Sequence, residues 1–84
     1  MSVRRYTVVI VDQAGYRALS TRTRRLFDAD MPRLAHDPRD PTGLRVNAVG
    51  RDTWQATVAD GEVIIQYRVV ERTVQVHVNA VLAP

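Results

Sequence analysis

Two runs of alternating side chains, joined by a short turn, constrain the fold of this sequence most strongly. The first run is "WQATV", residues 54–58, and the second is "EVIIQYRVV", residues 62–70. In both, apolar or aromatic residues recur at every second position, which is the period of a β-strand with one buried face. The Asp60-Gly61 pair between them accepts the positive φ angles of a tight turn. The pattern predicts an antiparallel hairpin.

The rest of the chain predicts an α+β domain in which a strand and two helices precede an antiparallel meander of three to four strands. We expect a strand over 4–11, a short helix over 13–19, a helix from Ser20 or Thr21 to about Ala35, a loop over 36–43, and strands over 44–49 and 74–82. Apolar residues in the long helix recur at three- and four-residue spacings, as a helix packed by one stripe requires. Pro32 predicts a kink or break near residues 28–31.

The helices are expected to bury their stripe on one face of the sheet, which leaves the other face polar. In the last strand we expect Val74, Val76, Val78 and Ala80 to point toward the helices. The opposite face then collects Gln55, Thr57, Gln66, Arg68, Gln75, His77 and Asn79. This polar sheet face is the most informative feature of the pattern.

Composition narrows the function classes. The 84 residues suffice for a single domain, residues 1–84, and they include no cysteine, which excludes disulfides and thiol chemistry and favours a cytoplasmic location. The two histidines have no ligand spacing, so neither a metal nor a cofactor is expected. No apolar run is long enough to cross a membrane. The net charge of +3 arises in residues 1–42, which hold eight Arg and five Asp, and it is compatible with an acidic or nucleic-acid partner.

Several short motifs, in order, resemble the RelE/ParE superfamily of bacterial toxins. They are Tyr6-Thr7-Val8 in the first strand, Leu34-Ala35-His36-Asp37-Pro38 after the second helix, Gly43-Leu44 before the next strand, the hairpin from Trp54 through Tyr67 and Val69, and Val74-Gln75-Val76 in the last strand. The resemblance covers nearly the whole chain. It implies a type II toxin–antitoxin module, in which the toxin cleaves mRNA at the ribosome or inhibits DNA gyrase and a cognate antitoxin neutralises it.

The chain departs from this family where ribonuclease members carry reactive side chains. Gln55 and Thr57 stand at the paired arginine positions, Ile64 replaces a further arginine, and the last strand ends without the usual Arg and Tyr. Whether the chain is an enzyme is therefore left open by the sequence. The alternative is a non-catalytic module on the same fold, which binds a protein or self-associates as a homodimer.

The resemblance and the strand pattern together select candidate residues. RNA cleavage needs a cation beside the phosphate and a group that transfers protons, and Arg68 and His77 are the predicted catalytic pair. Predicted substrate contacts are Arg45, Gln66, Gln75 and Asn79, and predicted antitoxin contacts are Arg22 and Arg25. Each has a simpler alternative: Arg68 could pair with Glu62 or Glu71, and the helix arginines could serve only as a solvated surface.

Overall fold

A computed structural model describes residues 5–83, so Arg4, the first residue of the expected N-terminal strand, lies outside the described residues. The elements follow in the order β1 (Thr7–Ile10), α1 (Gln13–Arg17), α2 (Thr21–His36), β2 (Arg45–Gly50), β3 (Thr53–Val58), β4 (Val63–Val70), the 3₁₀ turn η1 (Glu71–Thr73) and β5 (Gln75–Leu82). The first helix is thus one turn long, and the second spans 16 residues.

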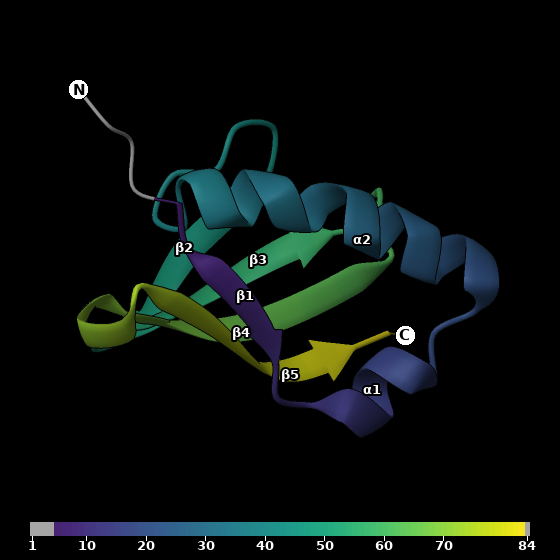
Figure 1. The fold of residues 1–84 in the computed structure, drawn as a ribbon. Helices are drawn as coiled ribbons and strands as arrows, with labels where there is room; N and C mark the ends of the chain where they lie inside the picture. The colour runs from purple at the N-terminus through teal and green to yellow at the C-terminus, as the bar shows by residue number, and fades with distance from the viewer. Residues whose placement is uncertain (1–4, 84) are drawn as a thin grey trace.

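Within the described residues, five strands form one mixed sheet in the order β1-β5-β4-β3-β2. Strands β2, β3, β4 and β5 pair with one another in antiparallel fashion, whereas β1 joins the edge of the sheet parallel to β5. Figure 1 shows α2 lying across one face of the sheet, with the short α1 near the C-terminal end of β5. The α+β class expected from the sequence is confirmed.

The helix α2 begins at a side-chain cap and runs without a break to His36. The Ser20 hydroxyl oxygen accepts a hydrogen bond from the Thr23 amide, which supplies the expected cap. Pro32 lies within the helix, so the predicted break is wrong. Phe27 and Leu34, on either side of Pro32 in the chain, are fully buried against the sheet. Their packing holds both halves of the helix against the sheet, since tertiary contacts contribute more to helix stability than one lost hydrogen bond.

The loop after α2 is tied to the centre of the sheet by Tyr67. This residue is fully buried on β4, and its hydroxyl donates a 2.6 Å hydrogen bond to the carbonyl oxygen of Pro38. Burial raises the pKa of Tyr67 above its usual range, and the charge of Asp37 adds to the effect. The neutral hydroxyl therefore remains a donor across the physiological pH range. Tyr67 lies in the core, as the alternation predicts.

A bulge in β5 changes which of its residues face the helices. Gln66 pairs with Ala80, but Tyr67 pairs with Val78, so Asn79 is an extra residue in the ladder. Beyond Asn79 the alternation is reversed: Ala80 faces away from the helices and Val81 is buried. The prediction that Ala80 points inward is wrong. Val74, also predicted inward, lies before the strand in a left-handed conformation with φ 53°.

Asp12 joins the start of α1 to the end of β5. Its carboxylate accepts hydrogen bonds from the amides of Gly15, at 2.9 Å, and Val81, at 3.0 Å. A Cβ atom at position 15 would lie 2.6 Å from the Val81 carbonyl oxygen, which explains a glycine within this helix. The hydrogen bonds from Gly15 and then Val81 lower the pKa of Asp12.

Because its folded-state pKa is lowered, ionised Asp12 stabilises the fold above the unfolded pKa of about 4. This contribution is lost as the pH falls through the folded-state pKa. We expect Asp12→Asn to lower the melting temperature at pH 7, since an amide can accept only one of the two hydrogen bonds. The difference from the wild type should shrink as the pH falls toward 2, measured by thermal unfolding. An equal difference at every pH would contradict an ionic role for Asp12.

Candidate functional site

The face of the sheet opposite α2, here called the outer face, carries the residues that the sequence predicts to act. One row crosses four strands: Thr53 on β3 is the register partner of Arg68 on β4, Arg68 of His77 on β5, and His77 of Val9 on β1. Directly paired residues of antiparallel strands have Cβ atoms about 4.5–5.5 Å apart. The tertiary structure thus brings the two predicted catalytic residues side by side, with Arg68 exposed and His77 half-buried.

A short hydrogen-bond chain along β5 orients His77. Its Nε2 lies 2.9 Å from Oε1 of Gln75, and the same oxygen accepts a 3.0 Å hydrogen bond from the Thr73 hydroxyl. Because an amide oxygen can only accept, this arrangement fits the tautomer with the proton on Nε2 and leaves Nδ1 as the acceptor. Gln75, predicted from the sequence as a substrate contact, here contacts His77. Thr73 was not predicted, because only the turn η1 brings it to Gln75.

Two glutamines extend the polar surface toward β3. Gln66 donates from Nε2 to Oε1 of Gln55 at 3.3 Å, and the two are register partners. Asn79 is exposed at the bulge of β5, next to Ala80, the register partner of Gln66. Gln66 is thus close to the pair formed by Arg68 and His77, and it offers amide groups to a ligand.

The outer face becomes apolar at one end. Ile64 and Leu82 are register partners with exposed fractions of 39% and 53%. Leu82 reaches this face because the bulge at Asn79 reverses the alternation, which the sequence pattern does not reveal. The outer face therefore combines a polar centre with an apolar end.

Arg45 lies away from the predicted catalytic pair. It is the register partner of Thr57, whereas Arg68 is the partner of Thr53, four residues earlier on β3. At about 3.3 Å per residue, this places the two rows roughly 13 Å apart. Arg45 borders a shallow cleft with Gly43 and the hairpin residues Asp60 and Gly61. A single ligand could contact both Arg45 and Arg68 only if it extended over this distance.

The predicted partner-binding arginines belong to the helix layer, on the opposite side of the sheet. Arg22 forms a 2.7 Å ion pair with Glu62, and this hydrogen bond raises the pKa of Arg22 and lowers that of Glu62. Arg25 is exposed on the same helix. Within the described residues, these two side chains therefore do not share a surface with Arg68 and His77.

The acidic residues proposed as partners for Arg68 are engaged elsewhere. Glu62 binds Arg22 and also accepts a 2.9 Å hydrogen bond from the Thr23 hydroxyl. Glu71 binds Arg39 and the Tyr6 hydroxyl, each at 2.7 Å. These contacts therefore do not support the simpler explanation for Arg68, which is a cross-strand ion pair with Glu62 or Glu71.

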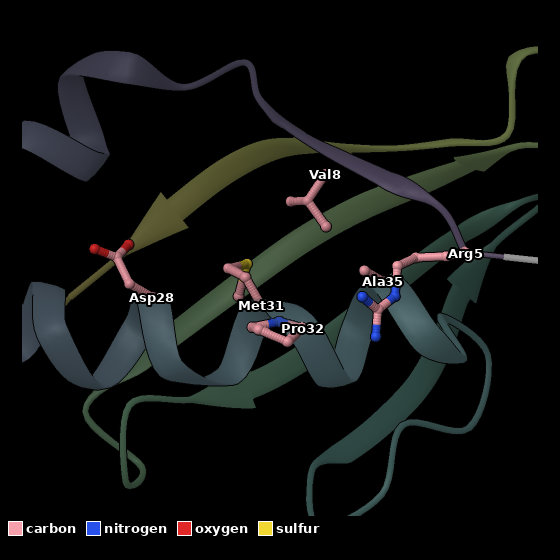
Figure 2. Close-up of a pocket in the computed structure, with 6 residues that line it drawn as sticks. All are labelled: Arg5, Val8, Asp28, Met31, Pro32 and Ala35. Carbon is pink, nitrogen blue, oxygen red and sulfur yellow. The ribbon is translucent and has the colours of Figure 1, made fainter.

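A second concave surface lies between β1 and α2. Figure 2 shows Arg5 and Asp28 at its two ends, with Val8, Met31 and Pro32 between them, and Ala35 completes the lining. Its volume is about 350 Å³. This surface, here called the β1–α2 groove, contains no residue that the sequence singled out for chemistry.

Two further findings bear on function. Among residues 5–83, no helix is both long and apolar enough to cross a bilayer. Searches against protein-family models, curated proteins and solved structures return no match to this chain.

Proposed function

We propose that this chain is the toxin component of a type II toxin–antitoxin module with a RelE/ParE-like fold, and that it cleaves mRNA at the ribosome. The observation that supports this most is the pairing of Arg68 with His77 on the outer face. The motif order supports the family, and the strand–helix–meander order is compatible with it. In this proposal a cognate antitoxin neutralises the toxin, and Arg22 and Arg25 are candidate contacts for it.

The chemistry follows from the two side chains. The ribose 2′-hydroxyl attacks the adjacent phosphate, and His77 accepts its proton at Nδ1, the ring nitrogen that Gln75 leaves available. The Arg68 guanidinium neutralises charge that develops on the phosphate oxygens. Gln66 and Asn79 can hydrogen-bond the flanking nucleotides. The 5′-oxygen then leaves, taking a proton from solvent.

Expression of the chain from an inducible promoter tests this proposal. We expect growth arrest, relief of the arrest by the small neighbouring gene, and new mRNA 5′ ends that primer extension detects only when ribosomes are present. Growth arrest with intact mRNA and inhibited supercoiling by purified gyrase would instead favour a gyrase-directed toxin. A harmless chain that binds no neighbouring gene product would refute the toxin proposal.

A second candidate is a non-catalytic binding module on the same fold. The exposed pair Ile64 and Leu82 favours it, because apolar side chains at the end of an otherwise polar face are common at protein interfaces. It predicts normal growth, intact mRNA and a stable protein complex that is lost in the I64D/L82D variant. An unaffected complex in that variant would exclude the outer face as its binding surface.

A further inference from the structure

The outermost strand β1 leaves part of its backbone available at the sheet edge. The amides of Thr7 and Val11 donate to carbonyl oxygens at positions 74 and 78, at 3.0 and 2.9 Å, on the β5 side. Backbone groups of successive strand residues point to opposite sides. Val8 and Ile10 therefore direct their N–H and C=O groups away from β5, along the β1–α2 groove.

Two groups on this edge are already satisfied within the chain. The Tyr6 amide donates to the Ala35 carbonyl oxygen at 2.8 Å, and the Ile10 carbonyl oxygen accepts from Nε2 of Gln13 at 2.6 Å. The groups that remain directed outward are the carbonyl of Tyr6, both groups of Val8 and the amide of Ile10. A strand that pairs with this edge must place its own N–H and C=O groups opposite these donors and acceptors.

The side chains around this edge form a pattern that is complementary to itself. Figure 2 places the Arg5 guanidinium at one end of the β1–α2 groove and the Asp28 carboxylate at the other, with Val8 and Met31 between them. Rotation by 180° about an axis through Val8 exchanges the two ends. A second copy in that orientation brings its Arg5 to Asp28 and its Asp28 to Arg5, as a two-fold interface requires.

We propose that a second copy of this chain binds along β1, antiparallel and with the two-fold axis at Val8, so that the two sheets become one. In this register the Val8 groups of the copies bond each other, and each Ile10 amide bonds the other copy's Tyr6 carbonyl. The only bond the register would lack joins the Tyr6 amide to the Ile10 carbonyl, and these are the two groups already satisfied within each chain. In a register centred on Thr7, Val8 would pair with Tyr6 of the other copy, whose amide is already bonded. In a register centred on Val9, Val8 would pair with Ile10 of the other copy, whose carbonyl oxygen is already bonded.

The same orientation fills the β1–α2 groove. Met31 and Pro32 lie on the side of α2 that borders the groove, and Ala35 extends this apolar surface by one turn. The second copy's Val8 and Met31 would pack against them. The contact consists of one strand edge and one small groove, so we expect a weak dimer that dissociates on dilution. The positive ends of the grooves stay apart, because Arg5 faces Asp28 rather than Arg5.

Reversing the charge at position 5 or 28 of the 84-residue chain tests this dimer. We expect the wild type to shift from monomer to dimer between micromolar and millimolar concentration in analytical ultracentrifugation. Arg5→Asp and Asp28→Arg should each weaken the dimer about tenfold or more, since each replaces two attractive contacts with repulsive ones. An equimolar mixture of the two variants should dimerise, because both contacts are then between opposite charges. A monomeric wild type, or variants that dimerise as well as the wild type, would overturn the proposal.

Introduced thiols test the register, since the sequence contains no cysteine. In this register Thr7 of one copy lies opposite Val9 of the other at a non-hydrogen-bonded position, where Cα atoms are about 4.5 Å apart, within the roughly 4.4–6.8 Å that a disulfide spans. An equimolar mixture of the T7C and V9C variants should therefore form a covalent heterodimer under mild oxidation, and neither variant alone should form a covalent homodimer. Circular dichroism of the reduced proteins checks that both fold. Covalent homodimers of T7C alone or of V9C alone would move the axis and refute the register.

Discussion

Replacing Tyr67 with alanine is expected to lower the free energy of unfolding by about 3–5 kcal/mol, as for other buried aromatic residues cut back to alanine. Tyr67 is fully buried at the centre of β4 and is the largest fully buried side chain among the described residues. Small domains have only about 5–15 kcal/mol of stability in total. The variant should therefore retain little free energy of unfolding at room temperature. Urea denaturation followed by circular dichroism would measure the loss.

Tyr67→Phe separates the hydroxyl from the ring. It keeps the packing but leaves the Pro38 carbonyl without its donor, which should cost about 1–3 kcal/mol. Pro38 is buried, so water cannot replace the lost hydrogen bond without entering the core. The loss should appear as faster hydrogen exchange in the loop at 37–43. A phenylalanine variant as stable as the wild type would show that the loop is held by other contacts.

Replacing His77 with alanine is expected to lower mRNA cleavage by about 10²–10⁴-fold, the contribution typical of a positioned proton-transfer group. The expectation rests on the proposed ribonuclease function. Arg68→Ala should have a comparable effect, whereas Arg68→Lys should keep part of the activity, because lysine retains the charge but not the planar guanidinium. Cleavage of a defined mRNA in a reconstituted translation system measures all three.

Folding must be separated from catalysis in these variants. Both side chains lie on the outer face, away from the buried core, so the melting temperatures should stay close to the wild-type value. Gln75→Leu is the matched test of orientation: it removes the acceptor beside Nε2 of His77 and leaves the imidazole in place. ¹⁵N chemical shifts of the ring should then report loss of the Nε2–H preference. Unchanged cleavage in the alanine variant of His77 would refute its catalytic role.

The sequence predicts the secondary structure well where the pattern is local. The hairpin turn is one example: Asp60 and Gly61 have φ angles of 56° and 84°, as the Asp-Gly pair suggests. The cap at Ser20 is another, because its hydrogen bond involves a residue only three positions away. Pro32 and Asn79 were less predictable. The continuity of α2 depends on packing against the sheet, and the bulge in β5 depends on the register with β4.

The sequence likewise predicts only part of the candidate site. Alternation within each strand predicts that Arg68 and His77 lie on the outer face, and the alternation holds through both positions. Their adjacency required the register between β4 and β5, which the hydrophobic pattern leaves undetermined by steps of two residues. The sequence pattern also does not reveal the bulge at Asn79, which exposes Leu82, or the register that separates Arg45 from the pair.

The sequence by itself determined the α+β class, the hairpin, the helix cap and a mainly polar outer face, because these follow from periodicities and turn preferences within a few residues. Tertiary structure alone decided that β1 joins β5 in parallel at the edge, that Asn79 forms a bulge, and that Gln75 orients His77. The open edge of β1 and its groove beside α2 belong to this second group. These features depend on contacts between segments far apart in the chain, and such contacts are selected by the packing of the whole core.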